Sequence, residues 1–293
     1  MKIKFWGVRG SIPTPGPQTI RYGGNTPCIE VAGNDGTLVI LDSGSGMRPL
    51  GETLATKAPL DIHLFLTHTH WDHIHGFPFF IPAYIPNNKI HIYGPSHFNK
   101  KLHEIMAHQM SYSYFPVRVD ELKANITYRD LKEETLKIGN FEITSKLMNH
   151  PVTAFGYRVT EGERKLVYTG DHEPYYNFLG SDDDQSGDDV NLIIDEQNKG
   201  IRDFISPADV LIGDSHYLEE EYESKKGWGH SHIFQTLDLA LSAKVKHLVL
   251  FHHDPARSDI EVDALTEAVI KRCQKLGKEL KITPAKEGDE INL

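Results

Sequence analysis

The sequence has few cysteines and no long apolar stretch. Of its 293 residues only Cys28 and Cys273 are cysteines, and neither belongs to a C-x-x-C pair. Two cysteines do not make the disulfide framework of a small secreted domain, so both are expected to be buried thiols. No segment approaches the roughly 18 continuous apolar residues that a membrane-spanning helix needs. We therefore expect no membrane span.

A low-complexity linker and an internal repeat are also missing. The length is compatible with one large domain, and we expect residues 1–293 to form a single domain. Residues 1–7 are typical of a strand and lack the apolar core of a signal peptide. We therefore expect the protein to be cytoplasmic.

The charge is biased towards acid. The net charge is -10 and the isoelectric point about 5.9. An acidic protein is not steered towards long polyanions, which argues against long nucleic acid as a partner. The hydrophobic content of 39% is enough for an ordinary globular core.

Apolar runs and turn residues predict strands that alternate with helices. The predicted strands cover residues 3–8, 28–32, 38–41, 62–66, 90–93, 210–212 and 247–251, with several more pieces between 126 and 167. The predicted helices cover residues 47–57, 98–110, 192–204, 231–243 and 258–276. This order favours two β-rich halves with helices outside, a layered α/β architecture.

The most informative segment directly follows the strand predicted at 62–66. It reads Thr-His-Thr-His-Trp-Asp-His and contains His68, His70, Asp72 and His73. Imidazole nitrogen and carboxylate oxygen are the usual zinc ligands at such sites. An extended backbone puts His68 and His70 on one face. Asp72 and His73 follow as the chain turns away, and can serve a second ion about 3.5–4 Å from the first.

Two ions need further ligands, and three later residues qualify. His150, Asp171 and His252 each follow a strand-like run, where the side chains of functional sites are often found. His253 competes with His252 for the last position. We favour His252 because it directly follows the apolar strand that ends at Phe251.

With these residues in place, the chain resembles the metallo-β-lactamase superfamily over nearly its whole length. The resemblance implies a four-layer αβ/βα sandwich with the metals in the cleft between two β-sheets. In that pattern the first metal is held by His68, His70 and His150, the second by Asp72, His73 and His252, and Asp171 bridges them. Asp42, in Leu-Asp-Ser-Gly, matches a carboxylate that fixes the tautomer of a ligand histidine.

Within the superfamily the chain is most similar to the ribonuclease Z-like phosphodiesterase branch. The similarity lies in three segments and in their order along the chain. They are residues 210–217, the element Trp-Gly-His-Ser-His at 228–232, and residues 248–252. It implies that His230 is the catalytic histidine and Asp214 its paired carboxylate, although a histidine here could also only cap the following helix. The phrase Arg-Tyr-Gly-Gly-Asn-Thr resembles a bacterial subgroup of metal-dependent hydrolases, and its Tyr22 and Asn25 are candidate substrate contacts.

The resemblance implies a metal-dependent hydrolase with two divalent ions, zinc first, with Mn²⁺ or Fe²⁺ as alternatives. A metal-bridging hydroxide oriented by Asp72 would attack phosphorus, and His230, polarised by Asp214, would stabilise the oxyanion or protonate the leaving oxygen. The long arm that grips tRNA in ribonuclease Z has no counterpart here. We therefore predict a small phosphodiester substrate such as a cyclic nucleotide, and the family suggests a homodimer.

Two alternatives stay open at this point. A carbonyl-centre hydrolase of the thioesterase or lactonase type, like glyoxalase II, would use the same ligands. The aromatic cluster of Tyr112, Tyr114 and Phe115 could stack on a base, or could form a lid or a dimer contact.

Overall fold

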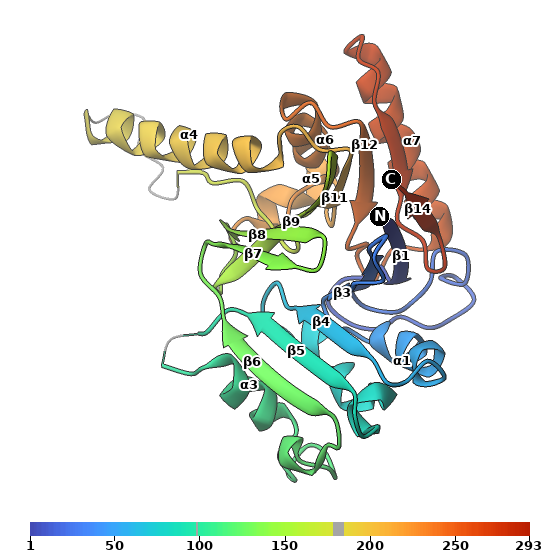
Figure 1. The fold of residues 1–293 in the computed structure, drawn as a ribbon. Helices are drawn as coiled ribbons and strands as arrows, with labels where there is room; N and C mark the ends of the chain where they lie inside the picture. The colour runs from blue at the N-terminus through green and yellow to red at the C-terminus, as the bar shows by residue number, and fades with distance from the viewer. Residues whose placement is uncertain (98, 178–184) are drawn as a thin grey trace.

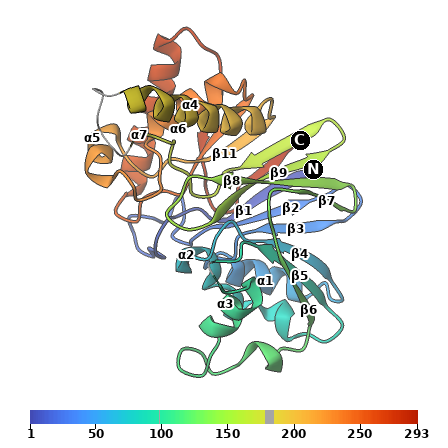
Figure 2. The same ribbon diagram turned by 90° about the vertical axis from the view of Figure 1, so that its left-hand side faces the viewer.

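Two mixed β-sheets face each other in the computed structural model, which describes residues 1–97, 99–177 and 185–293 (Figure 1). Each sheet has seven strands within this described part of the chain. Helices cover the outer side of each sheet, as Figure 2 shows. The predicted α/β sandwich is thus confirmed.

The first sheet has the strand order β14-β1-β2-β3-β4-β5-β6. Its strands are β1 (Lys2–Gly7), β2 (Cys28–Ala32), β3 (Leu38–Leu41), β4 (Asp61–Phe65), β5 (Lys89–Gly94), β6 (Asn125–Asp130) and β14 (Glu290–Asn292). Strands β3 to β6 are parallel, so their carboxyl ends lie at one edge of the sheet. The strand β1 pairs with β14, which brings the two termini side by side (Figure 1).

The second sheet has the order β13-β12-β11-β10-β9-β8-β7. Its strands are β7 (Thr135–Ile138), β8 (Phe141–Met148), β9 (Ala154–Glu161), β10 (Arg164–Tyr168), β11 (Val210–Asp214), β12 (His247–Phe251) and β13 (Lys281–Pro284). The strands β7 to β10 form an antiparallel meander, and β10 to β13 are parallel. Every residue of β11 and β12 is buried, as expected for parallel strands covered on both faces.

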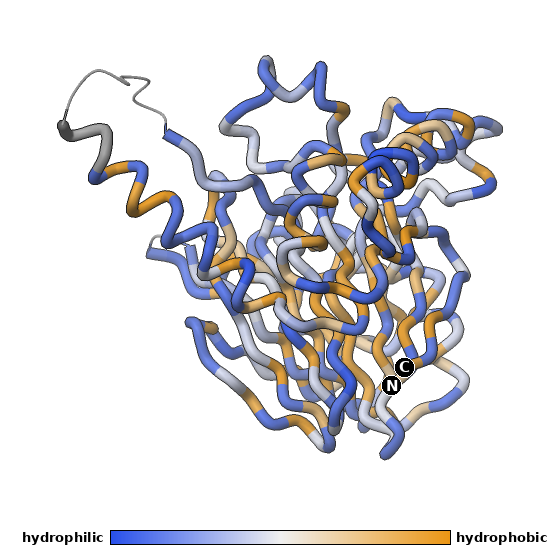
Figure 3. Tube along the Cα trace, turned by 90° about the horizontal axis from the view of Figure 1, so that it is seen from above, coloured by the Kyte–Doolittle hydropathy of each residue, from blue (hydrophilic) through white to orange (hydrophobic). Residues whose placement is uncertain are grey.

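Helices close the two outer layers. They are α1 (Met47–Ala55), α2 (Trp71–Ile74), α3 (Leu102–Gln109), α4 (Gln185–Ile205), α5 (Glu219–Tyr222), α6 (Ile233–Ser242) and α7 (Asp259–Lys275), with short 3₁₀ turns η1 (Phe77–Phe79), η2 (Ile81–Tyr84), η3 (Val119–Glu121) and η4 (Glu223–Lys225). Side chains of α1 and α3 share a buried cluster with the first sheet, and those of α4, α6 and α7 share one with the second. The amino-terminal part of α4 projects from the body (Figures 1 and 3).

The main core lies between the sheets, where apolar side chains of both meet. Phe5 and Phe251, from opposite sheets, have ring centroids 6.2 Å apart. The hydroxyl of Tyr157, on β9, donates to the carbonyl oxygen of Leu66, just after β4. This bond joins the two sheets next to the histidine-rich segment, so packing of the core also sets where that segment begins.

Most elements lie where the sequence predicts them. The strands predicted at 28–32 and 38–41 coincide with β2 and β3, and the helix predicted at 47–57 is α1. The helix predicted from 98 begins at Leu102, and residue 98 lies outside the described residues. The short strands β13 and β14 were not predicted, because they carry little apolar pattern and depend on pairing with β12 and β1. Among the described residues no helix combines the length and apolar character needed to cross a membrane.

A matched pair of leucines tests the core. Leu166 on β10 is fully buried between the sheets, whereas Leu192 on α4 is 67% exposed. We expect Leu166→Ala to lower the free energy of unfolding by about 2–5 kcal/mol through lost burial and a cavity. Leu192→Ala should change it by less than about 0.5 kcal/mol. Urea unfolding followed by circular dichroism measures both, and equal losses would contradict this core.

Candidate metal centre

The predicted metal ligands meet at one edge of the sandwich, although they come from both sheets. Each follows the carboxyl end of a strand, the place where α/β sheets usually form sites. They are His68, His70, Asp72 and His73 after β4, His150 after β8, Asp171 after β10 and His252 after β12. Their convergence depends on how the sheets face each other, which no local sequence pattern contains.

The first group consists of His68, His70, His150 and Asp171. One ligand-type atom of each lies within 4.8 Å of the others. The Nε2 atom of His68 lies 3.4 Å from Oδ2 of Asp171, and that of His150 lies 4.0 Å from the same oxygen. Nδ1 of His70 lies 3.1 Å from Nε2 of His150. These spacings suit three imidazoles around one small cation.

The second group consists of Asp72, His73, His252 and again Asp171. Here the other carboxylate oxygen of Asp171, Oδ1, lies 3.3 Å from Nε2 of His73 and 3.2 Å from Nε2 of His252. Oδ2 of Asp72 is 3.3 Å from both imidazole nitrogens. Asp171 therefore offers one oxygen to each group, which is the arrangement of a bridging ligand.

The charge state of the first group fits a cation. Burial lowers the pKa of His68 well below its usual value and that of His150 to about 4, so both imidazoles are neutral. Burial alone would raise the pKa of Asp171, but His252 and His73 hold it well below its usual range, so the carboxylate is ionised. Nε2 of His68 and Oδ1 of Asp171 are buried without a hydrogen-bond partner among the described residues. Buried polar atoms rarely stay unpaired, and a divalent cation would satisfy both.

Asp42 fixes the orientation of one predicted ligand, His73. Its Oδ2 lies 2.8 Å from Nδ1 of His73 and accepts a hydrogen bond from the hydroxyl of Tyr168, and its Oδ1 accepts from the backbone N–H of Thr67. A carboxylate at Nδ1 keeps the proton there and leaves the Nε2 lone pair of His73 facing the group. This is the position that the resemblance implies for Asp42.

The side chains of the two adjacent histidines after β12 have different surroundings. His252 faces the second group, whereas Nε2 of His253 contacts the carbonyl oxygen of Ala285, 2.9 Å away, and its ring packs on Tyr22. Gly10 lies against His252, where a Cβ atom at Gly10 would stand 2.4 Å from the imidazole. The geometry thus favours His252 as the ligand.

His230 and Asp214 lie beside both groups. Nδ1 of His230 is 2.9 Å from Oδ2 of Asp214, and its ring stacks on His252 with centroids 4.9 Å apart. Burial lowers the pKa of His230, but the charges of Asp214 and Asp171 outweigh it and raise that pKa to about 9. The ring also stacks on His216, with centroids 4.5 Å apart. The helix α6 is capped by His232, whose side chain accepts from the N–H of Phe234, so that role does not fall to His230.

Sequence reasoning missed Glu173, which holds the loop that carries His230. Its carboxylate accepts hydrogen bonds from the backbone N–H groups of Gly227 and Gly229 and from the hydroxyl of Tyr222. The carbonyl oxygen of Gly229 in turn lies 2.9 Å from Nδ1 of His150. Gly229 has a φ of +87°, and a Cβ there would overlap the His150 ring. The only signal in the sequence is that Glu173 follows Asp171 by two residues.

The loop after β1 reaches the centre through its backbone, and this corrects a prediction. The N–H of Ser11 donates to Oδ2 of Asp72 at 2.8 Å, and Ser11 lines the hollow over the centre. The predicted substrate contacts Tyr22 and Asn25 are turned elsewhere. The hydroxyl of Tyr22 donates to Asp263, and the amide of Asn25 donates to Glu287. Both side chains therefore hold the loop in place and do not line the hollow.

Another histidine group lies within β4 and β5, apart from the metal centre. His63 and His91 are register partners on these strands, their rings stack at 4.8 Å, and Asp61 lies 3.1 Å from Nε2 of His91. Both histidines stand within their strands, whereas the metal centre lies beyond the strand ends.

The adjacent histidines provide a matched test of the ligand set. We expect His252→Gln to lower the amount of divalent metal bound per chain, because it removes an imidazole from the second group. His253→Gln should leave that amount unchanged, since His253 only bonds to a backbone carbonyl. Elemental analysis after dialysis measures both, and a loss confined to the His253 variant would reverse the assignment.

Comparison with known proteins identifies the family of the chain. A family model described as the β-lactamase superfamily domain matches residues 38–253. Ribonuclease Z from Haloarcula marismortui is 25% identical over 86% of this chain and 86% of its own length, and ribonuclease Z from Thermococcus kodakarensis is 25% identical over 94% and 90%. The crystal structure of the metallo-β-lactamase fold protein YhfI from Bacillus subtilis superposes with a TM-score of 0.70 at 19% identity, covering 99% of this chain and 98% of YhfI. The resemblance predicted from the sequence is confirmed, and the chain belongs to the β-lactamase superfamily.

Proposed function

We propose that the protein is a metal-dependent phosphodiester hydrolase that holds two divalent ions, zinc by preference, and cleaves a small phosphodiester such as a cyclic nucleotide. The full-length relatives named ribonuclease Z support the phosphodiester class. The two ligand groups that share Asp171 support two ions. All of residues 1–293 would act as a single domain, because the site draws on both sheets.

The observation that carries the proposal is the pair of His230 and Asp214 next to the ligand groups. His230 lines the same hollow as His70, Asp72 and Asp171. Because Nδ1 of His230 faces Asp214, the Nε2–H is the proton left for a substrate. A proton donor at this position suits a reaction in which negative charge grows on a leaving oxygen.

When bound, divalent ions would act as Lewis acids towards the phosphate oxygens and would make a water molecule more acidic. The residues of the chain supply the rest. Asp72, fixed by the N–H of Ser11, would orient the attacking water. His230 would donate its proton to the leaving oxygen, and Asp214 would hold the imidazole in the required tautomer. Glu173 would keep His230 at its distance from the groups.

Size and charge support a small substrate. The hollow over the centre has a volume of about 420 Å³, within the range of small-molecule sites. The net charge of -10 disfavours a long polyanion. The second candidate is the carbonyl-centre hydrolase, which would use the same ligand groups.

Hydrolysis of bis-(p-nitrophenyl) phosphate by zinc-loaded protein tests the chemistry. We expect His68→Ala to abolish it, because a ligand is lost, and His230→Ala to lower kcat by about 10²- to 10⁴-fold, the usual effect of a general acid. His232→Ala is the matched control. It loses the cap of α6 but should keep kcat within a few fold, since its side chain accepts from Phe234 instead of facing the centre. An unchanged rate in the His230 variant would remove its proposed role.

A substrate panel separates the alternatives. We expect cyclic nucleotides to be hydrolysed with a higher kcat/KM than precursor tRNA, a thioester or a lactone. Initial rates with equal metal content provide the comparison. Turnover of the thioester or lactone without any phosphodiester would favour the carbonyl-centre reading, and a preference for precursor tRNA would overturn the small substrate.

A further inference from the structure

A second hollow adjoins the metal centre, and four aromatic side chains are among the residues that line it. It has a volume of about 500 Å³ and lies between α2, the turn η1, the helix α3 and the segment that follows α3. Its aromatic wall, hereafter the aromatic pocket, is formed by Trp71, Phe79, Tyr114 and Phe115. The size falls within the range of small-molecule sites, about 300–1,000 Å³.

The aromatic pocket adjoins the hollow over the metal centre. Thr69 and Trp71 line both, and these two residues stand between the ligands His68, His70 and Asp72 in the sequence. A molecule whose phosphate lies at the ligand groups can therefore extend past Trp71 without leaving the protein surface. The pocket is in the right place for the part of a substrate next to the phosphodiester.

The walls of this pocket are unusually exposed for aromatic side chains. Trp71 is 82% exposed, Tyr114 70% and Phe79 54%. Neighbouring rings hold them in place, since Phe79 meets Phe115 edge to face at 5.3 Å and Tyr114 meets His108 at 5.7 Å. A contiguous exposed aromatic surface beside a site usually marks a binding surface. Flat aromatic rings bind other flat rings by stacking, whatever the identity of the base.

Polar groups also face this space. Thr69, His75, His108 and Gln109 line the same pocket. Aromatic walls with a few polar groups suit a heteroaromatic ring better than an alkyl chain, because the ring offers both a π face and a polar edge. The metal-side hollow suits the phosphate, and the aromatic pocket suits a base attached to it.

We propose that the aromatic pocket binds the base of a nucleotide substrate. This inference rests on the proposed function, since it names the group attached to the phosphodiester. Within it, Trp71 is the ring between the two hollows, while Phe79 and Tyr114 are the outer stacking residues. A phosphodiester without a base would use only the metal-side hollow.

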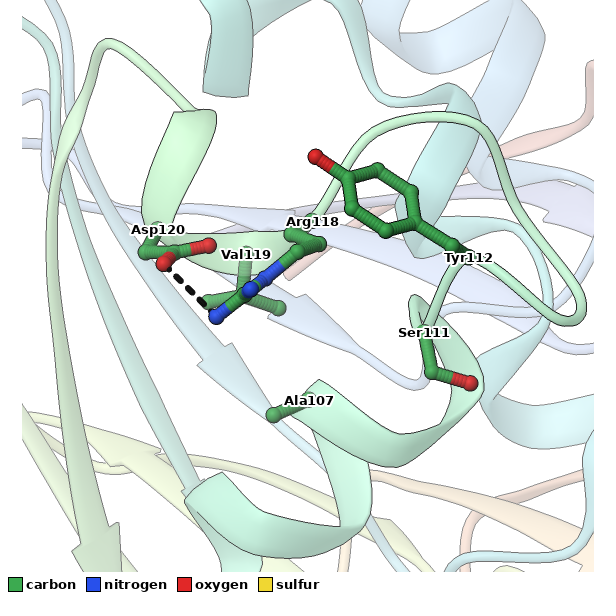
Figure 4. Close-up of a pocket in the computed structure, with 6 residues that line it drawn as sticks. All are labelled: Ala107, Ser111, Tyr112, Arg118, Val119 and Asp120. Atoms are coloured by element: carbon green, nitrogen blue, oxygen red, sulfur yellow. Dashed lines mark hydrogen bonds and ion pairs between the residues drawn. The ribbon is translucent and has the colours of Figure 1, made fainter.

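The chain offers a matched control on the same segment. Tyr112 is also an exposed tyrosine, at 65%, but it lines a different hollow of about 450 Å³, drawn in Figure 4. That hollow is bordered by Arg118, whose guanidinium pairs with Asp120 at 2.9 Å (Figure 4). None of the residues that line it also lines the hollow over the metal centre.

The test is equilibrium binding of adenosine 5′-monophosphate and of inorganic phosphate to the zinc-loaded protein, by calorimetry. We expect the nucleotide to bind more tightly than phosphate by on the order of 10-fold or more, the usual effect of a stacked base. Tyr114→Ala and Phe79→Ala should each remove most of this difference and leave phosphate binding unchanged. Tyr112→Ala should preserve the difference.

Equal binding of nucleotide and phosphate to the unmodified protein would overturn the proposal, and so would a Tyr114 variant that keeps the difference. A shift of the Phe79 variant to a smaller species in sedimentation would also overturn it, because a second copy of the chain would then cover the pocket. Binding does not require turnover. Failure to cleave bis-(p-nitrophenyl) phosphate together with the expected binding pattern would therefore reject the phosphodiesterase and keep the base pocket.

Discussion

The site depends on the interactions of the Asp171 carboxylate with the surrounding imidazoles. It is almost fully buried, and each of its two oxygens faces a different set of imidazoles. A buried carboxylate is costly unless positive charge surrounds it. The centre meets this constraint with histidines from both sheets. The arrangement explains why so many polar groups are tolerated at the end of an otherwise apolar sandwich.

The predicted ligands and the loop of His230 are held in place by hydrogen bonds from neighbouring residues. Asp42 fixes His73, Ser11 fixes Asp72, and Glu173 fixes the loop of His230. Three residues at the site, Ser11, Asp42 and His252, have positive φ angles although none is glycine. Such conformations cost energy and persist only where the surroundings enforce them. The rigid sandwich therefore holds the loops at its edge in the conformations that the site requires.

In the proposed function, each of the two hollows binds a different part of the substrate. The metal-side hollow can hold any phosphate or carbonyl centre, because the ligand groups are common to both chemistries. We propose that His230 with Asp214 on one side and the aromatic pocket on the other provide the discrimination.

The sequence by itself determined the local features of this protein. The motif from His68 to His73, the apolar strands before each ligand and the strand–helix order were readable, because spacing and periodicity are properties of neighbouring residues. It also predicted Asp42, Asp214 and His230 through resemblance. The tertiary structure decided the features that depend on packing between distant segments. They are the choice of His252 over His253, the turn of Tyr22 and Asn25 away from the centre, the anchoring of the His230 loop by Glu173, and the position of Trp71 beside both hollows. These contacts cross between the sheets or between loops, and only the folded core brings them within hydrogen-bonding distance.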